Sequence, residues 1–170
     1  MSQLPSISAE LINRAIAGNA AAQFEVATLY MESEDEQHIE LAEEWALKAA
    51  ANGHVEAMYW LGEGYTVYAK ELLEEDPEEA KYYFEQAYHW LKQASSVKHA
   101  ASILELAGFY RRGDVVEKDV VKSVALVQQA AELGEVQAMR DLACIYAHGL
   151  GVEIDEAKAD EWNDKAQQTS

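Results

Sequence analysis

One spacing of small, aliphatic and tyrosine residues recurs four times along this chain of 170 residues. Each copy places a small residue first, a branched apolar residue four positions later, a second small residue at five and a tyrosine at eight. The copies are Ala22-Val26-Ala27-Tyr30, Ala57-Leu61-Gly62-Tyr65, Ser102-Leu106-Ala107-Tyr110 and Ala138-Leu142-Ala143-Tyr146. Such offsets fall on one face of an α-helix, so each copy predicts a helix packed through that face. Recurrence at this period is typical of repeat architectures, in which similar units stack in a line.

A second pattern follows each copy and predicts a second helix. It consists of a small residue, a tryptophan or leucine and an alanine, and its members are Ala42-Trp45-Ala49, Ala87-Trp90-Ala94, Ser123-Leu126-Ala130 and Ala159-Trp162-Ala166. We expect the tryptophan to fill the space between repeats while the small residues let neighbouring backbones approach. The chain is therefore predicted to be all-α, an α/α solenoid of four helical hairpins.

The repeat also sets the expected boundaries of a single domain over residues 1–170. An N-terminal helix is expected at about 8–17, followed by repeats at about 20–54, 55–98, 100–134 and 136–170. Glycine stands four residues before three of the copies, where a helix would end, and Lys98 takes that place before the remaining copy. Asp119, Asp155 and the pair Asp76-Pro77 are positioned to start the second helix of a hairpin.

The turn between the two helices carries a Gly-x-Gly pair at Gly149 and Gly151. A phosphate-binding loop would need a buried strand before the glycines, whereas the preceding segment has helical periodicity. We therefore expect these glycines to serve the backbone conformation of a turn.

Residues 138–166 read A-x-x-x-L-A-x-x-Y, then Y-x-x-G-x-G-V-x-x-D, then A-x-x-W-x-x-K-A. This pattern resembles the Sel-like repeat, a relative of the tetratricopeptide repeat with a longer turn. Residues 102–134 match it with Leu126 in place of tryptophan, the first copy lacks the turn glycines, and the second has extra residues between Tyr65 and Trp90. The resemblance implies a right-handed superhelix whose first helices line the concave side, used as a non-catalytic scaffold or adaptor for protein partners. Bacterial relatives also include immunity proteins that neutralise a toxin by direct binding, which is the alternative function.

The net charge of −18 bears on the class of partner. A chain this acidic repels phosphate, so neither nucleic acid nor an anionic membrane is an expected partner. The acids cluster in residues 32–44 and 71–79, which form either a solvated edge or a surface that attracts a basic or amphipathic protein. The N-terminal residues show no secretion leader, so a cytoplasmic location is expected.

Two sets of residues are candidates for binding that partner. The third and sixth offsets of the first helices face away from the packed side, and carry Glu25, Trp60, Glu63, Glu105 and Asp141, together with Thr28, Gly108 and Cys144. Carboxylates around an exposed Trp60 suggest an anchor for a basic segment, although these positions could equally be only solvated. The second set is the aromatic insertion of the second repeat, including Tyr68, Tyr82 and Tyr83, which is either extra core or a surface facing a partner.

No catalytic centre, cofactor site or metal site is predicted. Cys144 is the single cysteine, and the five histidines lack the spacing of metal ligands. Ser95-x-x-Lys98 matches the first motif of penicillin-recognising enzymes, but Ser-Asp-Asn and Lys-Thr-Gly are missing.

Overall fold

The computed structural model describes residues 7–32 and 36–169 and contains only helices within them. A single helix, α1 (Ala9–Ile16), precedes four hairpins. These are α2 (Ala20–Met31) with α3 (Glu36–Ala51), α4 (Val55–Leu72) with α5 (Pro77–Ser96), α6 (Ala100–Arg112) with α7 (Val120–Glu132), and α8 (Val136–His148) with α9 (Glu156–Thr169). The predicted all-α solenoid is confirmed. Across the described residues, no helix has both the length and the apolar character that crossing a membrane requires.

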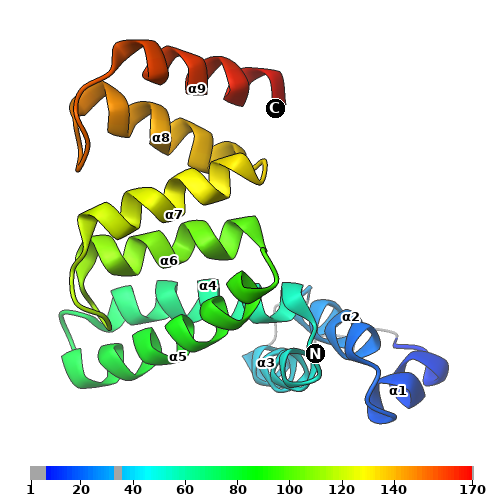
Figure 1. Ribbon diagram of the computed structural model, residues 1–170. Helices are drawn as coiled ribbons and strands as arrows, with labels where there is room; N and C mark the ends of the chain where they lie inside the picture. Colours follow the sequence, from blue (N-terminus) through cyan, green and yellow to red (C-terminus); the bar gives the residue numbers. More distant parts are fainter. Residues whose placement is uncertain (1–6, 33–35, 170) are drawn as a thin grey trace.

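The helices stack in chain order, and each packs chiefly against its neighbours in sequence. Figure 1 shows α4 to α9 as a column, with α1, α2 and α3 turned away from its lower end. Contacts within a hairpin are more extensive than contacts between hairpins, and α4 also touches α6. The molecule is thus a row of hairpins held together by local contacts.

The hydrophobic core is divided along this row into four clusters. Trp45 packs against both the α1–α2 cluster and the cluster shared by the first two hairpins, and Trp90 packs against the latter. Trp162 packs against the cluster that joins the last two hairpins. All three tryptophans are only partly buried, and they fill the space between elements as the sequence predicts.

Positive φ angles end the second helices of the hairpins. Gly53 and Gly134 have φ of 88° and 96°, and Lys98 adopts 62° at the corresponding place. At the opposite ends, Asp76 and Asp119 accept hydrogen bonds from the backbone N–H groups of Glu79 (3.0 Å) and Lys122 (2.9 Å).

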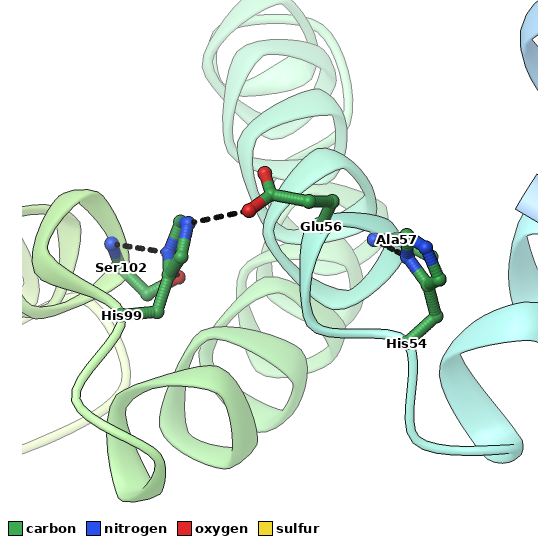
Figure 2. Close-up of polar contacts among 5 residues, drawn as sticks. All are labelled: His54, Glu56, Ala57, His99 and Ser102. Atoms are coloured by element: carbon green, nitrogen blue, oxygen red, sulfur yellow. Dashed lines mark hydrogen bonds and ion pairs between the residues drawn. The ribbon is translucent and has the colours of Figure 1, made fainter. Parts of the chain in front are cut away.

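Histidines begin two of the first helices, a role the sequence did not suggest (Figure 2). The Nδ1 atom of His54 accepts a hydrogen bond from the Ala57 N–H at 3.2 Å, and Nδ1 of His99 accepts from the Ser102 N–H at 3.3 Å. The Nε2 atom of His99 also lies 3.4 Å from a Glu56 carboxylate oxygen, which links α6 to the start of α4. These two histidines therefore cap helices, as asparagine and aspartate commonly do.

The extra residues of the second repeat lengthen α4 to 18 residues and α5 to 20 residues. Part of the added surface is core, because Phe84 and Leu91 are buried and the Phe84 ring lies edge-on to Phe109 at 6.1 Å. Tyr68 and Tyr82 stay exposed by 43% and 55%. The insertion thus adds core and leaves part of its aromatic edge open.

Candidate functional site

Two grooves lie between consecutive hairpins. The C-terminal groove has a volume of about 450 Å³ and is built mainly from α6, α7 and α8, with Lys70 of α4 at its edge. Its apolar wall consists of Leu104, Ala107, Val120, Val124, Val127, Ile145 and Leu150. Its polar wall consists of Lys70, Glu105, Arg111, Arg112, Ser123, Gln137, Asp141 and Cys144. A groove with one apolar wall and one charged or polar wall suits an amphipathic segment of another protein.

Charges of both signs surround Glu105 in this groove. Burial is the largest influence and raises the pKa of the Glu105 carboxyl, and the nearby acids Glu63 and Asp141 raise it further. Lys70 and Arg112 act in the opposite direction. The expected row of carboxylates is therefore present at Glu63, Glu105 and Asp141, but cations are interspersed with it.

Gly108 has a structural reason to be glycine at a groove position. A Cβ atom there would lie 2.9 Å from Nη1 of Arg112, so the missing side chain makes room for the guanidinium. Arg112 is held over the Phe109 ring at 5.3 Å and its Nε atom donates to Asp114. The cation is thereby fixed at the wall of the groove.

The aromatic groove lies between the first and second hairpins, mainly along α4, and has a volume of about 380 Å³. It is lined by Met31, Ile39, Glu43, Trp60, Leu61, Gly64, Tyr65, Tyr68 and Tyr83. The Tyr68 and Tyr83 rings meet edge to face at 4.7 Å, and Tyr65 lies 5.7 Å from Tyr83. The Tyr65 hydroxyl donates to Glu43 at 2.5 Å, which orients this carboxylate. Burial, followed by this hydrogen bond and by the Glu43 charge, raises the pKa of Tyr65 well above its ordinary value.

The two grooves occupy equivalent places in the repeat. Trp60 and Asp141 both stand at the third offset of their helices, and each lines its groove. Ile39 and Val120 likewise both stand six residues before the tryptophan or leucine of the second helix. Corresponding repeat positions thus line both grooves, but the second repeat supplies aromatic rings to one, whereas the other is lined by charged residues of the second, third and fourth repeats.

The structure distributes the predicted binding residues over these two grooves. Trp60, Tyr68 and Tyr83 line the aromatic groove, and Glu105 and Asp141 line the C-terminal groove. Glu63 is exposed on α4 and contributes to the electrostatics at Glu105.

Three sequence expectations need correction or lose support. Glu25 is exposed on α2 but lines neither groove, and neither does Tyr82, although its ring contacts Tyr83 at 5.3 Å. Trp60 is less exposed than expected, because it is partly buried against the core cluster of the first two hairpins, and its role as an anchor stays a prediction. Its indole forms a wall of a groove and does not project from the surface.

Sequence reasoning missed several lining residues. Arg112 follows Gly108 by four positions and Met31 follows Thr28 by three, so extending the helical face by one turn would have found both. Glu43 and Ile39 lie in α3, the second helix of the first hairpin, and only the packing of the first hairpin against the next shows that they face the groove.

The groups considered for catalysis have structural partners. Ser95 donates to the backbone carbonyl of Lys92 at 2.8 Å and is not paired with Lys98. The Cys144 thiol lies 3.6 Å from Nδ1 of His148, which also contacts the Cys144 carbonyl at 2.9 Å. Over the described residues, no three His, Cys, Asp or Glu side chains come together where they could hold a metal ion.

The family model of the Sel1 repeat matches this chain at residues 20–54, 55–89, 84–98, 100–135 and 136–166. The chain belongs to the Sel1 repeat family. Two of the matches fall within the hairpin of α4 and α5, which is the one that carries the extra residues. Sel1 repeat proteins generally mediate protein–protein interactions.

Solved Sel1 repeat structures resemble this one along nearly its whole length. A protective antigen of uropathogenic Escherichia coli strains with an SLR fold is 28% identical, with a TM-score of 0.78, and the match covers 95% of this chain and 33% of that protein. A Sel1 repeat protein from Oxalobacter formigenes is 25% identical, with a TM-score of 0.75 and coverage of 94% and 62%. A sel1 repeat protein from Klebsiella pneumoniae is 29% identical, with a TM-score of 0.60 and coverage of 95% and 74%.

This chain therefore spans about a third of the first of these proteins and less than two thirds of the second. Among curated proteins, none matches the chain.

Proposed function

We propose that this Sel1 repeat protein is a non-catalytic scaffold that binds an amphipathic segment of a partner protein in the C-terminal groove. The partner's apolar side chains would contact the valine and leucine wall, and its charged groups would pair with Glu105, Asp141 and the neighbouring cations. The acidic residues that cluster in 32–44 and 71–79 would attract the basic part of the same partner. A cytoplasmic location remains part of this proposal, as does the alternative that the partner is a toxin.

The observation that carries the proposal is the environment of Glu105. Its carboxyl is largely buried, and its raised pKa means that the charged form is disfavoured there by loss of water. Loss of water around a carboxylate is unfavourable unless opposite charges or hydrogen-bond donors replace that water. A partner cation or N–H donor would stabilise the charged form of Glu105 further, in addition to the nearby Lys70 and Arg112.

The test uses immobilised protein and a lysate of the cells that make it. The double variant Glu105→Lys with Asp141→Lys reverses both groove acids, and we expect it to lose proteins that the wild type retains, as identified by mass spectrometry. With the purified partner, calorimetry should show an affinity at least about tenfold lower, equivalent to about 1.4 kcal/mol.

The matched control is Glu10→Lys with Asp160→Lys, which changes the net charge equally at exposed residues outside both grooves. This control should retain the same proteins as the wild type. Retention of every partner by the groove variant would show that the C-terminal groove is not the binding site.

A further inference from the structure

Cations from the chain itself lie over five partly exposed aromatic rings outside the aromatic groove and over the buried ring of Phe109. The pairs are Lys48 over Trp45, Lys92 over Tyr88, Arg112 over Phe109, Lys122 over Tyr110, Lys158 over Tyr146 and Lys165 over Trp162, at 4.1 to 5.8 Å. A cation over an aromatic face is attracted by the electron density of the ring. This contact is therefore a recurring element of the repeat.

The last two hairpins make the contact in the same register. Lys122 and Lys158 both stand four residues before the tryptophan or leucine of the second helix, and each covers the repeat tyrosine of its own hairpin. The corresponding residue of the second hairpin is Gln86, four residues before Trp90. The repeat tyrosine there is Tyr65, which lines the aromatic groove and hydrogen-bonds to Glu43.

Among the described residues that line it, the aromatic groove consequently has rings and a carboxylate but no cation. Within residues 7–32 and 36–169, no lysine or arginine lies over Trp60, Tyr65, Tyr68 or Tyr83. In the part of the chain that the structure describes, the one lysine, arginine, aspartate or glutamate that lines the groove is Glu43.

The charge around the groove favours a positive ligand. Burial raises the pKa of the Tyr83 hydroxyl, and the neighbouring Tyr68, Glu79 and Glu43 raise it further, so both carboxylates act on this wall. The walls otherwise consist of apolar or aromatic groups, which displace water and strengthen both ion pairing and cation–π attraction.

We infer that the aromatic groove binds an arginine side chain from a basic segment of a partner protein. A guanidinium is planar and weakly hydrated, so it can stack on an aromatic ring while its edge donates two hydrogen bonds to the Glu43 carboxylate. Its aliphatic stem would lie against Met31 and Ile39, which are exposed by 42% and 51%. This inference rests on the proposed function and gives the partner a defined chemical feature.

The experiment titrates full-length protein, labelled with ¹³C at the methionine methyl groups, with the peptide acetyl-Gly-Arg-Gly-amide. Met31 lines the groove, whereas Met58 and Met139 are buried in the core and serve as internal references. We expect a saturable shift of the Met31 methyl signal with unchanged references. The citrulline peptide, which is neutral and has nearly the same shape, should bind at least about tenfold more weakly.

Glu43→Gln is the decisive variant because an amide oxygen can still accept the Tyr65 hydrogen bond while the charge is lost. We expect its affinity for the arginine peptide to fall at least fivefold. The matched control, Glu44→Gln, removes the same charge from the next residue of α3, which lies outside the groove, and should bind as the wild type does.

Three results would overturn the inference: equal binding of the citrulline peptide, equal binding of a lysine peptide, or undiminished binding by Glu43→Gln. If the arginine peptide fails to bind while a partner still binds in the C-terminal groove, this inference falls and the proposed function stands. If the arginine peptide binds and no partner depends on Glu105 and Asp141, the C-terminal groove is not the binding site and arginine binding in the aromatic groove stands.

Discussion

Lys98 shows how a single residue bears the strain of a helix end. Its φ of 62° lies in the left-handed region, where the equivalent helix ends have glycine. This conformation costs a residue with a Cβ atom about 1–2 kcal/mol. Replacing that residue by glycine removes the cost, but part of the gain in stability is lost because glycine gives the unfolded chain more conformational entropy. We expect Lys98→Gly to raise the free energy of unfolding by about 0.5–1 kcal/mol, measured by urea denaturation.

The reciprocal variant provides the control at the same scale. Gly53 has φ of 88° and no atom within 4 Å of a Cβ placed there, so Gly53→Lys changes the backbone energy without a clash. It should lower the free energy of unfolding by a similar amount. A stabilising Gly53→Lys would mean that the left-handed conformation is not what distinguishes these positions.

At the scale of the helix pair, Gly62 sets how closely α4 approaches α5. A Cβ atom at this residue would lie 2.4 Å from Cγ of Leu91, so alanine requires the two helices or the leucine to move. We expect Gly62→Ala to lower the free energy of unfolding by about 1–3 kcal/mol through overpacking. Gly64→Ala, two residues further along α4, meets no atom within 4 Å and should instead stabilise the helix by about 0.5–1 kcal/mol. Equal effects of the two substitutions in thermal or urea unfolding would contradict this packing.

The helices also show which features the sequence could predict and which it could not. Gly62 stands at the offset that holds Ala27, Ala107 and Ala143 in the other copies, so its place on the packed face was evident from spacing. Spacing also placed Glu105 and Asp141 on one accessible face. It could not place Glu43 beside Tyr65, because that contact depends on how one hairpin rests on the next. Helical periodicity fixes which face a residue occupies, whereas a groove also depends on the angle and distance between helices.

For the molecule as a whole, the stacked order of the hairpins predicts which helices are destabilised by a substitution in one hairpin. The last hairpin makes its main contacts through α8 to α7, and Trp162 packs into the cluster that joins these elements. Replacing a buried tryptophan by alanine costs about 3–5 kcal/mol, and Trp162→Ala should cost somewhat less because its side chain is partly exposed.

In a row of units coupled only to their neighbours, this loss should be felt locally. We expect hydrogen exchange in Trp162→Ala to accelerate most in α8 and α9, less in α7, and not measurably in α4 and α5. Trp45→Ala should give the mirror image, with faster exchange in α1 to α3 and unchanged exchange in α8 and α9. Uniform acceleration of exchange over all hairpins in either variant would show that the chain unfolds as one cooperative unit. That result would contradict the local response expected of a linear repeat protein. A local response would allow one groove to be altered with little effect on the other, even though Tyr65 and Tyr83 of the aromatic groove pack against the core cluster that joins the second and third hairpins.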